Sequence, residues 1–230
     1  MNLILLTDKV KKSVKNISLA YITFEGINVK KEQPLVLKSY ISEVMRDIKC
    51  SYNLELLKEN EVIRNYRDFY WHHLSIDPTK IRPSSEALIR RILANNPIPK
   101  ISSIVDLNNW VSIHTLIPLG AYDLEKLSLP LKLRFAKIGE KFEPIGGKMK
   151  ELKGKEIILT DNTELIIHLY PHRDSNITKI TNSTRNMLVV ACGVPRVSIE
   201  KLKKALELFR NLLEKLSEKP INSSKIISLK

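Results

Sequence analysis

The chain of 230 residues is 43% hydrophobic and 27% charged, a balance typical of globular proteins. No window approaches the roughly 20 uninterrupted apolar residues of a bilayer span, which argues against a membrane partner. The 38 basic residues outnumber the 25 acidic ones, and the formal net charge of +13 favours RNA as a polyanionic partner as strongly as it favours a merely solvated basic surface.

The first 64 residues predict strands followed by helices. Residues 16–29 have the β-branched and aromatic content of one or two strands. Apolar residues recur at helical spacing from Gln33 to Lys49, and a second short helix is predicted at about 54–64.

Two further helices are predicted before the chain changes character. Ser84 can cap the first, which the apolar spacing predicts over residues 85–95. The second opens at Ser102, carries the hexapeptide VDLNNW and ends before Pro118.

After Gly120 the apolar residues follow the period of two that is typical of strands. Five short segments separated by turn residues have this pattern: LKLRFAKI, EKFEPI, KEIILTD, ELIIHLY and MLVVACGV. Ser198 caps a closing helix with an apolar stripe, and residues 219–230 are expected to form a flexible tail.

Helices that precede most of the strands predict an α+β fold, with a mixed or antiparallel sheet flanked by helices. We expect a single domain over residues 1–218, with an N-terminal strand and helix part (1–64) and a core (65–218). The sequence does not indicate an oligomeric state.

The two cysteines, Cys50 and Cys192, provide neither a disulfide framework nor a paired metal site, and we expect buried free thiols. The start of the chain has its apolar run before its lysines and no small-residue cleavage site, which predicts a cytoplasmic protein. We predict no metal and no cofactor, and we do not expect DNA as a partner.

The stretch VDLNNW places polar side chains inside an apolar helix. A buried amide or carboxylate costs a few kcal/mol unless it is paired. For Asp106 we favour a structural role, whereas Asn108 and Asn109 are equally compatible with bracing the sheet and with facing a pocket.

A second polar cluster, HRDS, lies in the turn that follows a predicted strand. His172, Arg173 and Asp174 stand there beside hydroxyl residues at three-residue spacing, Thr178, Thr181 and Thr184. Such groups can orient an α-amino group, a ribose or a phosphate. The alternative is a hydrogen-bonded turn with a surface ion pair that contributes little.

Several motifs in the second half of the chain follow one another in a recognisable order. They are Val105-Asp106, Asn109, Pro118, Ala121-Tyr122-Asp123, Arg134-Phe135-Ala136, Gly139-Glu140, Glu156, Asp161 and Thr184. This pattern, over about residues 83–195, resembles the B3/B4 domain of the phenylalanyl-tRNA synthetase β-subunit. The resemblance implies a B3/B4-like fold and a pocket that takes the 3′ end of misacylated tRNA and hydrolyses the wrong aminoacyl ester.

Nothing in the chain resembles the catalytic core of a synthetase, so it is similar to a free-standing B3/B4 protein. Gly120 stands where the synthetase pattern has a pocket histidine, and Val190 where it has a pocket glutamate. A glycine cannot act on the ester or its ribose. The resemblance therefore does not imply specificity for tyrosine.

The site predictions combine both arguments. The predicted substrate pocket consists of Asn108, Asn109, Gly120, His172, Arg173, Asp174, Thr178 and Thr181. Predicted structural polar residues are Asp106, Asp123 and Glu140, and predicted RNA contacts are Arg90, Arg91 and Arg134. His114 and His168, inside apolar runs, are expected to be satisfied core or surface histidines, and no catalytic residue is identified.

Two functions remain open from the sequence. The first is an RNA-binding hydrolase that removes a mischarged amino acid from tRNA in trans by means of a positioned water. The second is a module that binds tRNA or an amino acid without chemistry, which Gly120 and Val190 favour. A small-molecule enzyme on the same scaffold is a third reading, because fold does not determine function.

Overall fold

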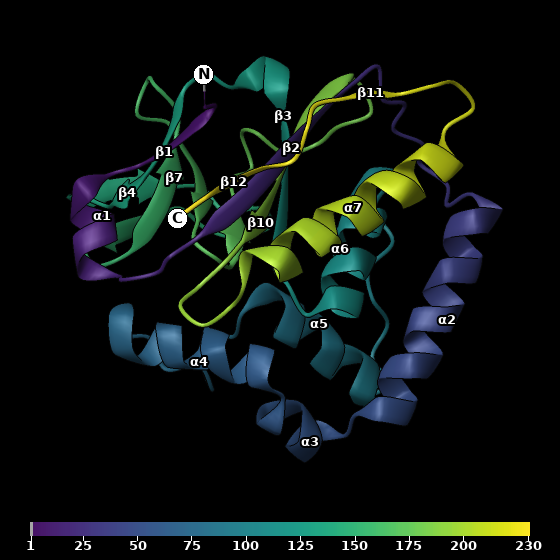
Figure 1. Ribbon diagram of the computed structural model, residues 1–230, viewed down its shortest axis with the longest axis horizontal. Coiled ribbons are helices and arrows are strands. Elements are labelled where there is room, and N and C mark those ends of the chain that lie inside the picture. Colours follow the sequence, from purple (N-terminus) through teal and green to yellow (C-terminus); the bar gives the residue numbers. More distant parts are fainter. Residues whose placement is uncertain (1) are drawn as a thin grey trace.

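The computed structural model describes residues 2–230, in which most of the helices lie together on one side of the strands (Figure 1). The helices are α1 (Asp8–Ser13), α2 (Leu35–Ser51), α3 (Leu54–Glu59), α4 (Glu61–His73), α5 (Ser84–Leu93), α6 (Ser103–Thr115), α7 (Ile199–Leu216) and a 3₁₀ turn at Leu124–Lys126. Among residues 2–230, no helix is both long and apolar enough to cross a bilayer.

The strands form two larger sheets and a separate hairpin. Their bounds are β1 (Ile4–Leu6), β2 (Leu19–Glu25), β3 (Leu119–Asp123), β4 (Leu131–Phe135), β5 (Ile138–Phe142), β6 (Lys150–Lys153), β7 (Ile157–Thr160), β8 (Ile166–Leu169), β9 (Arg173–Asp174), β10 (Asn186–Cys192), β11 (Asn222–Ser223) and β12 (Ile227–Leu229).

The first sheet has the order β1-β4-β7-β8-β9, in which β1 runs parallel to β4 and the other neighbours are antiparallel. The second sheet has the order β11-β2-β10-β3, with β12 also beside β2, and is antiparallel. Strands β5 and β6 form a two-stranded antiparallel hairpin. The predicted α+β class with mixed and antiparallel sheets flanked by helices is confirmed, although the five predicted strands are divided among these three units.

Strand β10 is the centre of the second sheet because its residues are apolar on both faces. From Met187 to Cys192 every residue is buried, and the strand lies between β2 and β3. The apolar stripe of α7, including Leu202, Leu206 and Phe209, packs against β2 and β10. This helix therefore closes one face of the sheet.

Helix α6 is surrounded by other elements, which explains why apolar residues occupy nearly all of its sides. It contacts α2, α5, α7 and the following strand β3. Ser102 caps its first turn through a hydrogen bond from the Val105 amide. Because the helix is enclosed, each polar side chain on it requires either a partner or a cavity.

Two predicted segments differ in the structure. The predicted helix at 54–64 is two helices, because Asn53 caps α3 and Asn60 accepts hydrogen bonds from the amides of Val62 and Ile63 and so starts α4 anew. The predicted flexible tail at 219–230 instead contributes β11 and β12, whose backbone groups pair with β2. Edge pairing with β2 orders a segment that has little apolar patterning of its own.

Candidate functional site

The two adjacent amides of α6 lie at one wall of a cleft. Asn108 and Asn109 both line it, and the Nδ2 of Asn108 donates to the carbonyl oxygen of Leu119 at 3.1 Å. The Oδ1 of the same side chain is buried and has no partner among residues 2–230. Asn108 is thus a brace for β3 that keeps one unsatisfied acceptor at the cleft wall.

Asp106 has a purely structural environment at the other end of α6. Its carboxylate accepts from the Ile101 amide at 2.9 Å and from the Gln33 side chain at 2.6 Å. It does not line the cleft. A carboxylate in the first turn also interacts favourably with the helix dipole, so Asp106 stabilises the start of the helix.

The turn between β8 and β9 supplies a carboxylate to the opposite wall. Asp174 Oδ1 lies 2.7 Å from His168 Nδ1 and accepts the hydroxyl of Tyr122 at 2.9 Å. Among the described residues no hydrogen bond or ion pair reaches its Oδ2. The protein thus holds Oδ1, and Oδ2 has no protein partner among the described residues. Because Asp174 lines the cleft, Oδ2 can bind a ligand or water.

His168 lies behind this carboxylate in a cluster of buried aromatic groups. Its Nε2 is 3.7 Å from the sulfur of Cys192, and its ring contacts Tyr122 and Tyr170 edge to face. Burial, followed by the nearby Asp174 charge, raises the pKa of the Cys192 thiol well above its usual value. Cys192 therefore remains a protonated thiol and is a poor nucleophile.

Gly120 lies beneath this arrangement on β3. A Cβ atom placed there would overlap the Tyr122 hydroxyl and lie 2.7 Å from its Cζ and 3.1 Å from Asp174 Oδ1. The absence of a side chain thus lets the Tyr122 ring fold back along its own strand and reach Asp174. Gly120 contributes space to the site, in place of the imidazole that the family pattern has at this position.

His172 also lines the cleft and is held neutral by its surroundings. Burial, with additional repulsion from His168, Arg173 and Lys150, lowers the pKa of His172 to about 3. Its Nδ1 is buried without a partner among residues 2–230, and its ring lies 5.7 Å from that of Tyr70. A neutral imidazole near pH 7 can donate or accept a hydrogen bond but carries no charge.

Cationic side chains from three separate segments surround the cleft. Lys80, Arg82, Lys150 and Arg173 all line it, and no ion pair of any of them is found within the described part of the chain. The cleft has a volume of about 480 Å³. One carboxylate, two amides, two imidazoles and four cations therefore converge on one concave site, as expected for a polar, anionic ligand.

Three of the predicted pocket residues do not line the cleft: Gly120, Thr178 and Thr181. Thr178 is fully buried, and Thr181 bonds to Thr184, whose hydroxyl donates to Asp123 Oδ2 at 2.8 Å. The segment that carries these threonines forms a bridge at Lys179 with β3. The hydroxyl of Thr184 consequently braces the turn at Asp123, and Thr178 and Thr181 lie outside the cleft.

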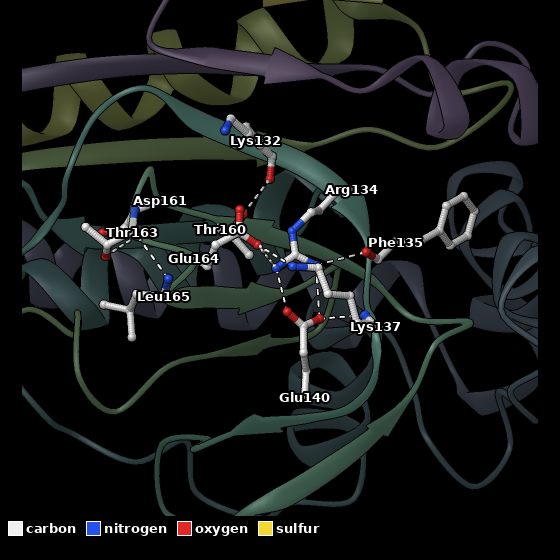
Figure 2. A network of polar contacts seen from close by, with 10 residues as sticks. All are labelled: Lys132, Arg134, Phe135, Lys137, Glu140, Thr160, Asp161, Thr163, Glu164 and Leu165. Atoms are coloured by element: carbon white, nitrogen blue, oxygen red, sulfur yellow. Dashed lines mark hydrogen bonds and ion pairs between the residues drawn. The ribbon is translucent and has the colours of Figure 1, made fainter.

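The predicted RNA contacts are occupied by protein partners. Arg134 is 11% exposed and bonds Glu140 at 2.6 and 2.9 Å and Glu164 at 2.8 Å (Figure 2). Lys137 joins the same network, and Glu140 also accepts its amide (Figure 2). The bonds to Glu140 and Glu164 raise the pKa of Arg134, although burial opposes this. Its charge is neutralised inside the first sheet, so Arg134 is not free to bind phosphate.

The two arginines of α5 are similarly engaged. Arg90, together with Arg67, donates at 2.8 Å to the fully buried carboxylate of Glu86. Arg91 donates to the carbonyl oxygen of Pro97 in the loop that follows the same helix. Neither Arg90 nor Arg91 lines the cleft.

The sequence analysis missed several groups that the structure places in or next to the cleft. Lys80, Arg82 and Lys150 belong to loops or a hairpin without a motif, and Tyr122 was noted only as part of the family pattern. His168 was predicted to be a satisfied histidine, and it is indeed buried and paired, yet it also lines the cleft. A polar residue within the apolar run ELIIHLY was the available signal.

A second cavity of about 250 Å³ lies between the end of α7 and the start of α6. Lys30 and Glu218, which form an ion pair at 2.6 Å, are among its lining residues. It holds no unpaired buried acceptor, whereas the cleft holds Asn108 Oδ1. Among the described residues, the cleft at Asp174 is therefore the stronger candidate for a binding site.

Curated relatives support the resemblance seen in the sequence. The chain is 31% identical over 134 residues to the phenylalanine–tRNA ligase beta subunit of Fusobacterium nucleatum subsp. nucleatum, covering 58% of this chain and 16% of that protein. It is 30% identical over 118 residues to the beta subunit of Bifidobacterium longum, covering 49% of this chain and 14% of that protein. The chain thus spans about a sixth or less of the length of these relatives.

A solved structure shows the same fold. An N-terminal fragment of the phenylalanyl-tRNA synthetase beta-subunit from Pyrococcus horikoshii matches with a TM-score of 0.51 and 14% identity, covering 92% of this chain and 48% of that one. A family model described as the B3/4 domain matches residues 65–228, which is more than half of the chain. The predicted resemblance is confirmed, and the chain belongs to the B3/4 domain family.

Proposed function

We propose that the cleft binds the 3′ end of an aminoacyl-tRNA and hydrolyses the ester that links the amino acid to the ribose. The observation that carries the proposal is the convergence of Asp174, Asn108, Asn109 and four cations on one cleft of about 480 Å³. The names of the relatives, which are tRNA ligase subunits, support tRNA as the nucleic acid. The enzyme would act in trans, on a tRNA charged elsewhere.

An aminoacyl ester is already activated, so its hydrolysis needs a positioned water, a proton acceptor and donors for the developing oxyanion. The free Oδ2 of Asp174 is the proton acceptor, since Oδ1 is held by His168 and Tyr122. The amide of Asn109 and the guanidinium of Arg173 line the same cleft and donate to the oxyanion. Water attacks the carbonyl carbon, and the ribose oxygen leaves with a proton.

The second candidate is a module that binds the same RNA end without cleaving it. Two features favour it: Gly120 supplies no functional group, and Val190, which pairs with Gly120 across the sheet, is buried and apolar. In this reading the carboxylate of Asp174 binds the α-ammonium of the amino acid rather than water. Both candidates use the same cleft and differ in turnover.

The test measures ester half-lives for a panel of misacylated tRNAs with the wild-type protein and with Asp174→Asn. The asparagine retains an acceptor for His168 and Tyr122, so the fold is preserved while the proton acceptor is lost. We expect at least a hundredfold slower hydrolysis of the preferred ester, with tRNA affinity within a few fold of wild type. The matched control is Asp47→Asn, at an exposed position outside the cleft.

Each outcome distinguishes the candidates. Saturable, strongly salt-dependent tRNA binding without turnover for any pairing would establish the non-catalytic module. Unchanged half-lives together with no measurable tRNA binding would refute both. Equal hydrolysis by wild type and Asp174→Asn would refute the role of Asp174 while retaining the activity.

A further inference from the structure

We propose that the β5–β6 hairpin is a docking arm for the phosphodiester backbone of RNA, and that it leads the strand into the cleft at Asp174. The inference rests on the proposed function for the identity of the nucleic acid. It concerns the exposed lysines of the hairpin, none of which is among the predicted RNA contacts Arg90, Arg91 and Arg134.

The hairpin carries a concentration of unpaired positive charge. Residues 138–155, which are the hairpin and the two residues after it, contain five lysines against three glutamates, and all five lysines are exposed. They are Lys141, Lys148, Lys150, Lys153 and Lys155. Within residues 2–230 no ion pair involves any of them, in contrast to Lys137 and Arg134 just before the hairpin.

A merely solvated lysine surface would not need a rigid support, but this hairpin has one. Phe142 and Leu152, one from each strand, are buried in a small hydrophobic cluster with Ile158 and Leu169 of the first sheet. The remaining residues of β6 are exposed. Each of the two strands is thus anchored to the first sheet by one buried apolar side chain, and the lysines of the hairpin are exposed to solvent.

The loop that connects β5 to β6 is joined directly to the turn that carries Asp174. The Ile145 amide donates to the Asp174 carbonyl oxygen at 3.0 Å, and Pro144 forms a bridge with Ser175. The Asn176 amide donates to the Glu143 carbonyl oxygen at 2.9 Å. The loop of the hairpin and the backbone of the segment that carries Asp174 therefore form one hydrogen-bonded unit.

The same hairpin also forms part of the cleft wall. Ile145 and Lys150 line the cleft beside Arg173, whereas the other four lysines lie outside it. An RNA strand whose 3′ end occupies the cleft consequently has a path of positive charge along the hairpin. Lysine acts on phosphate as a point charge on a flexible stem, so the contacts need no base sequence.

The electrostatic contribution of such an arm is measurable through salt dependence. Each neutralised phosphate of a single strand contributes about 0.7 to the slope of log affinity against log salt. Four lysines outside the cleft would therefore contribute about 3 to this slope. Substitution of exposed lysines by glutamine changes stability by about 0.5 kcal/mol or less, so the fold is retained.

The experiment compares Lys141→Gln/Lys148→Gln/Lys153→Gln/Lys155→Gln with a matched fourfold variant at exposed lysines elsewhere, Lys11→Gln/Lys12→Gln/Lys201→Gln/Lys204→Gln. Both lose the same charge. Affinity for a tRNA transcript that carries no amino acid is measured by fluorescence anisotropy across a salt series. We expect the hairpin variant to lose at least tenfold in affinity and about 3 in salt slope, and the control variant to lose less than about threefold.

Equal losses of tRNA affinity in the two variants would overturn the docking arm in favour of a diffuse effect of net charge. The proposal would also be overturned if the hairpin variant lost no affinity, or if the wild type did not bind tRNA. A small aminoacyl-adenosine ester, which has no RNA to dock, separates this inference from the proposed function. The hairpin variant should hydrolyse it at the wild-type rate. Loss of tRNA affinity in the hairpin variant, with no ester hydrolysis by any form, would support the arm and refute the hydrolase.

Discussion

Replacing Gly120 by alanine tests whether the glycine exists to admit Tyr122 to the carboxylate of Asp174. The added Cβ overlaps the Tyr122 hydroxyl and lies 2.7 Å from Cζ. Such overpacking costs about 1–3 kcal/mol. Displacing the hydroxyl also breaks a hydrogen bond to a charged group, which contributes about 1.5–3 kcal/mol. Alanine restores about 0.5–1 kcal/mol through chain entropy, so we expect a net loss of about 1.5–5.5 kcal/mol in the free energy of unfolding.

A double-mutant cycle with Tyr122→Phe isolates the cause. Phenylalanine removes the overlapping oxygen, so Gly120→Ala should be less damaging in that background by about 1 kcal/mol or more. Urea unfolding of the four proteins, monitored by circular dichroism, measures the free energies. Effects that add to within about 0.3–0.5 kcal/mol would show that the two residues are independent and would refute the steric argument.

Three other predictions concern stability and assembly. The pKa of His172 is lowered to about 3, so as the pH falls below 6.5 the unfolded chain takes up a proton that the folded protein does not. Between pH 7 and 5.5 the free energy of unfolding of wild type should therefore fall by about 1 kcal/mol more than that of His172→Gln. Equal losses in the two proteins would contradict this. Glu86→Ala, which leaves Arg67 and Arg90 without their buried partner, should cost about 3–5 kcal/mol, whereas the exposed control Glu59→Ala should cost less than about 1 kcal/mol in the same urea titration. Removal of residues 219–230 exposes the edge of β2 and should cause concentration-dependent association in size-exclusion chromatography; a truncated protein with the elution volume of a monomer at all concentrations would argue against edge protection.

Local patterns in the sequence predicted elements well where one segment suffices to determine them. The helices at 85–95 and after Ser198 were predicted to within about two residues, because the apolar stripe of each lies in the segment itself. Ser198 caps α7 as predicted, whereas Ser84 is the first residue of α5 and makes no cap hydrogen bond. The division of the helix at 54–64 was missed because Asn60 was not recognised as a second cap. The pairing of residues 219–230 depends on β2, some 200 residues earlier, and no local pattern contains it.

The site shows the same division between local and long-range information. Asn108, Asn109, His172, Arg173 and Asp174 were predicted from two separate segments and do line one cleft. The threonines were misassigned because three-residue spacing does not reveal which way a turn faces. The cationic residues of the cleft come from loops that carry no motif, and only folding brings them to Asp174.

The hairpin has a separate small apolar cluster beneath it, and this has a kinetic consequence. The cluster consists of Ala136, Phe142, Leu152, Ile158, Ile166 and Leu169, apart from the main core. A unit held by few apolar contacts opens at lower free energy than the whole protein. Backbone amides of β5 and β6 should thus exchange with deuterium well before those of β10, and a bound nucleic acid would be visible as slowed exchange confined to this ribbon.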